Sequence, residues 1–153
     1  VPSFLPDRFE PGTPNIPGIL GLHAALCDLE QTDMDKLHQH ELELTQYFIN
    51  GLMQMDPSES TLRAIGKHNT IERTSVVSVQ TLQTDMARVA YEMDDTYGIM
   101  TRVGLHCAPS AHKTLGTYPE GTIRFSFGPE NTHHEVDLAL HALAEITGSP
   151  YHL

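Results

Sequence analysis

The residue of this sequence with the clearest potential for chemistry is Cys107, in the segment Arg102–Pro109 with the sequence RVGLHCAP. A thiol becomes a useful nucleophile when its thiolate is stabilised, and His106 and Arg102 can accept a proton or supply positive charge. Because the segment follows a predicted strand, we expect a loop that presents a side chain to a substrate. A small buried cysteine is the alternative, since free cysteines are often buried, and the spacing alone leaves both open.

A second candidate is Arg124, in a stretch where apolar and polar residues alternate from Thr122 to Phe127. This period of two predicts a half-buried strand, with Ile123 and Phe125 facing the core and Arg124 facing away from it. An arginine on that face is able to bind an anion, and an ordinary surface salt bridge is the alternative.

The elements that must position these residues follow from apolar periodicity and from capping residues. Thr132 and Glu135 have the spacing of a capping box, and Gly98 and Gly148 are suited to end helices. We predict helices over residues 17–30, 35–55, 85–97 and 132–148, and strands over 61–65, 75–81, 99–103 and 122–127. The fold class is therefore α/β (α+β), with helices that cover a small sheet.

The segment before the first helix, Val1–Pro17, contains five prolines and predicts an arm of extended and turning backbone. Since no initiator methionine precedes it, we expect the chain to be part of a longer polypeptide. Cys27 lies within the first predicted helix, where we expect it to pack in the core.

Composition restricts the partners of the chain. Its 153 residues predict one globular unit, and a formal charge of -11 disfavours nucleic acid and anionic membranes as partners. Two cysteines are too few for a disulfide framework, so a cytoplasmic location is expected. The ten histidines predict a mostly surface-exposed set, and the spacing typical of structural zinc is missing, so no metal site is expected.

Three segments, in the same order, resemble the cysteine desulfurases, which are class V aminotransferases among the fold-type I pyridoxal-phosphate enzymes. These segments are Arg8–Asn15 (RFEPGTPN), Arg102–Ala108 (RVGLHCA), and Thr122–Ser126 (TIRFS) followed by Asn131–Glu135. The short loop with a histidine before the cysteine resembles the branch related to selenocysteine lyases. The resemblance covers nearly the whole chain and implies the small C-terminal domain of such an enzyme, with a three- or four-stranded sheet and helices mainly on one face. Residues 1–30 then form an arm and linking helix, and residues 31–153 form the domain.

The resemblance also implies roles for individual residues. Cys107 matches the nucleophile that takes sulfur from L-cysteine as a persulfide and leaves L-alanine. Arg124 matches the arginine that binds the substrate carboxylate, with His106 and Arg102 beside it in the substrate site. Gly12 and Thr13 match residues that reach the pyridoxal 5'-phosphate of a partner subunit, which implies a homodimer. A sulfur-acceptor protein, as in iron-sulfur cluster assembly, is the further partner implied.

Other interpretations remain open from the sequence. Lys113 follows His112 as the cofactor-binding lysine of this superfamily follows a histidine, but it lies after the cysteine loop, so we expect Lys113 to be a surface residue. The chain then lacks the lysine that binds the cofactor, and we expect it to be inactive in isolation. The substrate is alternatively selenocysteine or another amino acid. A stand-alone interaction module derived from this domain is the alternative outside the enzymes.

Overall fold

The structure is a computed structural model that describes residues 2–10 and 12–151. The terminal residues of the two expected domains, Val1 and His152–Leu153, and Pro11 of the expected arm lie outside the described residues. The chain divides into two compact units, Val1–Leu37 and His38–Leu153, which we describe separately. Among the described residues, no helix is both long and apolar enough to cross a membrane.

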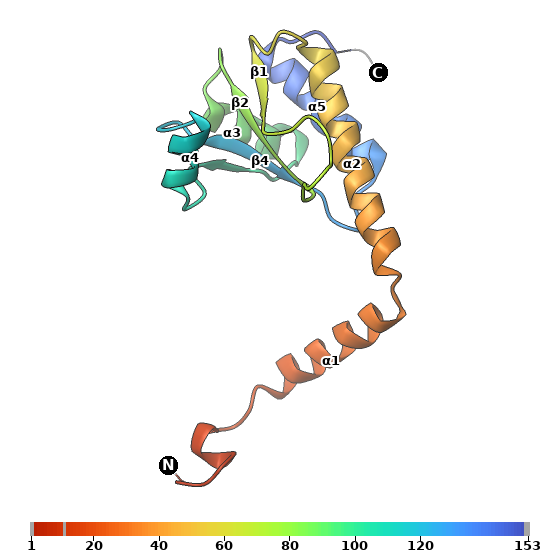
Figure 1. The fold of residues 1–153 in the computed structure, drawn as a ribbon, viewed down its shortest axis with the longest axis vertical. Coiled ribbons are helices and arrows are strands. Elements are labelled where there is room, and N and C mark those ends of the chain that lie inside the picture. Colours follow the sequence, from red (N-terminus) through yellow and green to blue (C-terminus); the bar gives the residue numbers. More distant parts are fainter. Residues whose placement is uncertain (1, 11, 152–153) are drawn as a thin grey trace. The chain divides into compact units, whose positions relative to one another are not determined.

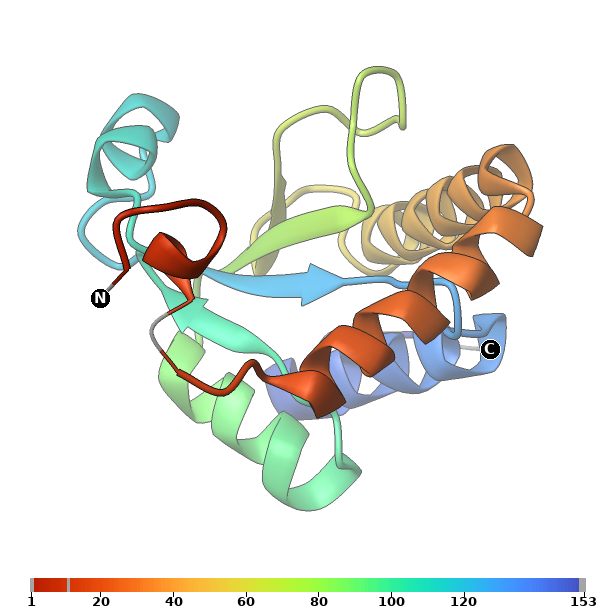
Figure 2. The same ribbon diagram turned by 90° about the horizontal axis from the view of Figure 1, so that it is seen from below.

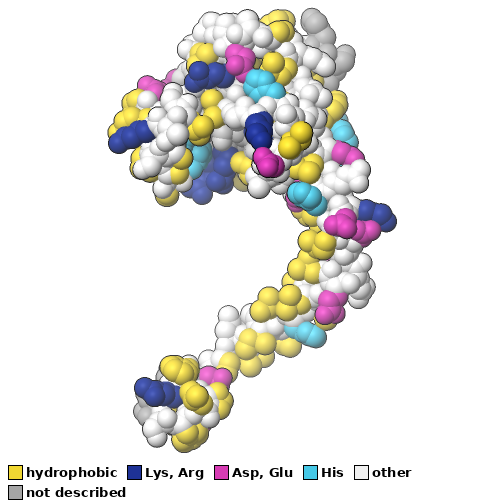
Figure 3. All heavy atoms as spheres, in the orientation of Figure 1, with side chains coloured by type: hydrophobic (Ala, Val, Ile, Leu, Met, Phe, Trp, Pro, Cys, Tyr) yellow, Lys and Arg dark blue, Asp and Glu magenta, His cyan; other side chains and the backbone are white. Residues whose placement is uncertain are grey.

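The first unit consists of a short 3-10 helix, η1 (Asp7–Phe9), and the helix α1 (Ile16–Gln31). The side chain of Asn15 accepts a hydrogen bond from Gly18 N at 3.2 Å and caps α1. No residue of α1 is buried, and apolar side chains are exposed along it (Figure 3). The prediction that Cys27 packs in a core is not borne out within this unit, where its side chain is only partly buried.

The second unit is built on a four-stranded antiparallel sheet with the strand order β1-β2-β4-β3 (Figure 1). The strands are β1 (Leu62–Ile65), β2 (Val76–Thr81), β3 (Arg102–Gly104) and β4 (Thr122–Ser126). The small sheet predicted from the sequence is thus confirmed, with four strands.

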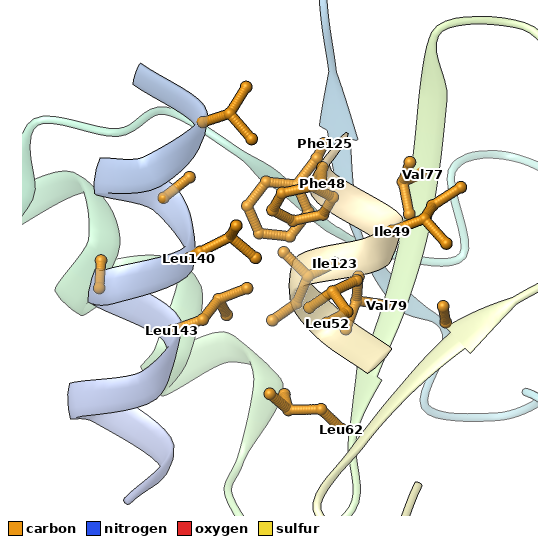
Figure 4. Close-up of a cluster of buried hydrophobic side chains, with 14 of the residues drawn as sticks. Phe48, Ile49, Leu52, Leu62, Val77, Val79, Ile123, Phe125, Leu140 and Leu143 are labelled. Atoms are coloured by element: carbon orange, nitrogen blue, oxygen red, sulfur yellow. The ribbon is translucent and has the colours of Figure 1, made fainter. Parts of the chain in front are cut away.

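Three helices, α2 (Met34–Met55), α3 (Met86–Tyr97) and α5 (His133–Thr147), enclose the hydrophobic core with one face of this sheet (Figures 2 and 4). The strands contribute alternate residues to it, namely Leu62, Ala64, Val77, Val79, Ile123 and Phe125. Gly51 lets α2 approach α5 closely, since a Cβ there would lie 2.3 Å from a methyl carbon of Leu140. The expected arrangement of helices mainly on one face is confirmed.

Local signals located most helix ends correctly. Asp85 accepts a hydrogen bond from Arg88 N at 2.8 Å, and Thr132 and Glu135 form the predicted capping box at the start of α5. Gly98 and Gly148 end α3 and α5 in the left-handed conformation, where glycine is favoured.

Two local predictions were incomplete. The strand expected over residues 99–103 is limited to Arg102–Gly104, because Ile99 N still bonds to Met93 O at 2.8 Å and closes the end of α3. The sequence analysis also missed a short helix, α4 (Pro109–Leu115), which lies apart from the three core helices (Figure 2). Proline at its first position is the signal that was available.

The turn before β1 is held by the buried carboxylate of Asp56. Its oxygens accept hydrogen bonds from the backbone of Thr61 and Leu62, at 2.6 and 3.0 Å, and from the hydroxyls of Ser58 and Ser60. Burial opposes ionisation, but these donors outweigh it and lower the pKa of Asp56 to about 2. The start of β1 is therefore firmly placed.

Candidate active site

Cys107 lies in the loop between β3 and α4, and its side chain is exposed. The expected loop is confirmed and the alternative of a buried cysteine is wrong. His106 and Cys107 have φ values of 50° and 59°, so two consecutive residues with side chains adopt the left-handed conformation. Such backbone costs roughly 1–3 kcal/mol per residue and persists only where the surroundings enforce it. The loop is therefore held in a specific shape that presents the thiol.

One of these constraints is the hydrogen bonding of His106. Its Nε2 lies 3.1 Å from the carbonyl oxygen and 3.3 Å from the hydroxyl of Thr122. Because a carbonyl oxygen only accepts, Nε2 carries the proton and donates it, and Nδ1 is the nitrogen free to accept one. Thr122 is itself buried although it lies on the face of the sheet turned away from the core, and His106 of the Cys107 loop is in contact with it there.

The protonation state of His106 follows from its surroundings. Burial lowers the pKa of His106 below its ordinary value of 6.5, and the hydrogen bond to Thr122 opposes this shift. Electrostatic interactions with Arg124, His112 and Arg102 lower the pKa of His106 further. At neutral pH the imidazole is therefore uncharged, which makes it a proton acceptor rather than a donor beside the thiol.

The other side of the loop is supported by His112 of α4, which is buried. Its Nδ1 lies 2.6 Å from the hydroxyl of Thr117, and its ring centroid lies 5.9 Å from that of His106. Lys113, the next residue, is exposed, with Nζ 5.0 Å from the ring centroid of Tyr118. The prediction that Lys113 is a surface residue is confirmed.

Arg102 and Arg124 lie directly opposite each other on β3 and β4, on the face of the sheet away from the core helices. Like charges in this arrangement repel. No carboxylate among residues 2–10 and 12–151 lies within 4.0 Å of either guanidinium, so the surface salt bridge considered for Arg124 is not formed there. Nε of Arg124 is buried without a hydrogen-bond partner in the same set of residues. Two neighbouring arginines with unpaired charge favour the binding of an anion, and a carboxylate fits their planar donors.

The residue that sequence reasoning missed is Gly121, which precedes β4 with a φ of 82°. A Cβ at Gly121 would lie 2.2 Å from the carbonyl oxygen of Gly104, so the two backbones are in direct contact. Gly104 begins the Cys107 loop, with a φ of 113°. The available signal was a glycine immediately before an alternating strand, which often marks a close backbone approach.

The substitution Gly121→Ala is expected to displace the Cys107 loop as well as to destabilise the domain, because the methyl group has no space beside Gly104. Gly98→Ala is the matched control: it has a similar positive φ of 66°, but nothing lies within 4 Å of the added carbon. The control should cost only the left-handed strain of about 1–2 kcal/mol, and Gly121→Ala should cost more. Thermal denaturation, combined with the rate at which Cys107 reacts with iodoacetamide, measures both effects. Equal melting temperatures and reaction rates for the two variants would contradict this account.

Gly12 and Thr13 belong to the first unit, whereas the other candidate site residues belong to the second, namely Arg102, His106, Cys107 and Arg124. Both are exposed, and a Cβ on Gly12 would meet nothing within 4 Å. Open backbone at a glycine beside a threonine hydroxyl fits a contact with a phosphate group. No group of three or more His, Cys, Asp or Glu residues within the described parts of the chain could hold a metal ion.

The sequence of this chain matches a known protein family. The family model of class V aminotransferases matches residues 3–139. The chain belongs to this family. Its members depend on pyridoxal phosphate.

Individual relatives of this class V aminotransferase chain are named as cysteine desulfurases. A probable cysteine desulfurase of Pyrococcus abyssi is 35% identical and covers 94% of this chain, and one of Borreliella burgdorferi is 32% identical and covers 86%. The apo structure of a cysteine desulfurase from Thermococcus onnurineus superposes with a TM-score of 0.79 at 33% identity, over 94% of this chain and 34% of that one. The chain spans 34% and 30% of the two curated relatives, about a third of their length.

Proposed function

We propose that this chain is the C-terminal part of a pyridoxal-phosphate-dependent cysteine desulfurase in which Cys107 takes sulfur from L-cysteine. The observation that carries the proposal is an exposed thiol, held in a strained loop beside a neutral histidine and two arginines with unpaired charge. A nucleophile, a proton acceptor and an anion site thus come together in one place. Relatives named as cysteine desulfurases, matched over nearly the whole chain, support the same reaction.

In this proposal each residue has a separate task. Arg124 binds the carboxylate of the substrate through parallel hydrogen bonds, and Arg102 adds positive charge beside it. The Nδ1 atom of His106 accepts the thiol proton of Cys107, which generates the thiolate. Gly12 and Thr13 would contact the phosphate of the cofactor in the partner subunit, and the bound cofactor would supply an electron sink for the α-carbon of the substrate.

The sulfur transfer balances as a nucleophilic displacement at sulfur. The Cys107 thiolate forms a bond to the substrate sulfur as the bond between that sulfur and its carbon breaks, and the electron pair of the broken bond stays with the carbon. Protonation of that carbon gives L-alanine, and Cys107 is left as a persulfide. The outer sulfur then passes to a thiol of an acceptor protein by the same kind of attack.

The proposal also assigns the parts of the chain. Residues 1–30 are an arm and linking helix, and residues 31–153 are the small domain. The complete enzyme is a cytoplasmic homodimer that delivers sulfur to an acceptor protein, as in iron-sulfur cluster assembly. The apolar residues exposed on α1, among them Leu22 and Leu26, support an arm that packs against other parts of that enzyme.

Mass spectrometry of the complete protein that contains this chain tests the proposal. After reconstitution with pyridoxal phosphate and incubation with L-cysteine, we expect one added sulfur on the peptide that carries Cys107 and none on the peptide that carries Cys27. The Cys107→Ser protein is the control and should gain no sulfur. Turnover of L-cysteine without a persulfide on Cys107 would refute the proposed role.

A further inference from the structure

A polar row crosses the sheet beneath the Cys107 loop, on the face away from the core helices. Arg63 of β1 lies opposite Gln80 of β2, and Thr122 of β4 lies opposite Gly104 of β3. The last pair in the register of β2 and β4 is Val79 with Ile123, and continuing that register by one residue sets Gln80 beside Thr122. One end of the row is therefore Arg63, and the other end is the start of the loop that carries the thiol.

The central member of the row is Gln80, whose side chain is only 6% exposed. Its Oε1 accepts a hydrogen bond from the guanidinium of Arg63, and its Nε2 donates one to the carbonyl oxygen of Gly121 at 3.3 Å. The orientation of the amide is unambiguous, because a guanidinium only donates and a carbonyl oxygen only accepts. Glutamine is thus matched to both neighbours at once.

The hydrogen bond from Gln80 reaches the point on which the loop rests. Gly121 contacts the backbone of Gly104, where the loop begins, and the next residue, Thr122, holds His106. Both contacts depend on the position of the same two residues, Gly121 and Thr122. A shift of this backbone would therefore move Gly104 and His106 together, and Cys107 with them.

Arg63 orients the chain of contacts that leads from Gln80 through Gly121 to the Cys107 loop. Its guanidinium donates to Gln80, and its Nε is buried without a hydrogen-bond partner among the described residues. Asp56 holds the backbone of Leu62, the residue before Arg63, at 3.0 Å. The connection thus starts from a firmly placed strand end and leads across two strands to the loop.

We propose that Gln80 is a positioning residue for Cys107, acting through Gly121 and Thr122. This inference rests on the proposed function only where it concerns the turnover of L-cysteine, since the effect of Gln80 on the Cys107 loop is measurable without any substrate. Arg124 lies on the neighbouring row, opposite Ser78. Loss of the Gln80 amide is therefore expected to disturb the nucleophile and to leave the binding of the substrate carboxylate intact.

The test uses the complete protein reconstituted with pyridoxal phosphate and compares Gln80→Met with Gln83→Met. Met has a similar length and no amide. Gln83 is the matched control, since its Nε2 also donates to a carbonyl oxygen, that of Ser60, at 3.2 Å. For Gln80→Met we expect slower reaction of Cys107 with iodoacetamide, kcat for L-cysteine lower by roughly 10- to 100-fold, and KM within about twofold of the wild-type value. Gln83→Met should match the wild type in all three.

A second variant separates positioning from folding. Gln80→Glu keeps an acceptor for Arg63 but cannot donate to Gly121, so it should fold and show the same losses of reactivity and kcat. If both Gln80 variants are only less stable to heat, with wild-type iodoacetamide reactivity and kcat below their melting temperatures, Gln80 has a structural role alone and the inference is wrong. If instead the proposed function is wrong, the wild-type protein forms no persulfide, while the Gln80 variants still change the reactivity of Cys107.

Discussion

Replacing Cys107 with alanine is expected to lower the turnover of L-cysteine by about 10³-fold or more, the order of loss that follows removal of an enzymatic nucleophile. The reason is that Cys107 is the exposed thiol of the candidate site and is proposed as the sulfur acceptor. Cys27 lies on α1 in the first unit, and it is the matched control. Production of L-alanine and release of sulfide under a reductant measure the effect, and Cys27→Ala should retain the wild-type rate.

The same Cys107→Ala protein distinguishes the proposed substrate from its nearest alternatives. Selenocysteine and cysteine sulfinate have leaving groups that depart without a protein thiol, so activity on them does not require Cys107. Retained activity on these substrates, with wild-type activity on them exceeding that on L-cysteine, would identify the complete protein as a lyase of that kind. Unchanged turnover of L-cysteine would contradict the role assigned to Cys107.

The second large effect is expected at Arg124, where substitution by methionine should reduce kcat/KM for L-cysteine by about 10²- to 10³-fold, mainly through a higher KM. The methionine removes a partly buried charged donor from its carboxylate partner, and loss of one partner of a desolvated charge pair typically costs about 2–5 kcal/mol. Arg124→Lys should recover only part of this loss, because an ammonium group lacks the planar pair of donors. Initial rates over a range of L-cysteine concentrations separate KM from kcat.

Arg88→Met is the matched control for the arginine substitution. Arg88 pairs with Glu92 at 2.7 Å on the exposed surface of α3, away from the sheet face that carries Arg124. Its loss should leave both kinetic constants close to the wild-type values, since exposed ion pairs contribute about 0–1 kcal/mol. An Arg124→Met protein with an unchanged KM would show that the carboxylate is bound elsewhere.

The local structure of this chain was largely readable from its sequence. Helix ends depend on side chains three or four residues away, so the caps at Asp85 and Thr132 and the terminating Gly98 were predicted and are present. The alternation around Ile123 likewise identified a strand and the face on which Arg124 lies. The short α4 was missed, because seven residues are too few to show a clear helical period.

The sequence predicted which residues belong to the candidate site, but it did not predict how they are arranged in space. The sequence by itself determined that Cys107 follows a histidine in a loop and that Arg124 faces away from the core. Only the tertiary structure decided that Arg102 stands opposite Arg124, that Thr122 holds His106, and that Gln80 supports Gly121. These contacts join residues that lie 16 to 41 positions apart in the chain. Neighbouring residues do not encode such contacts, since strand order and register depend on how the whole core packs.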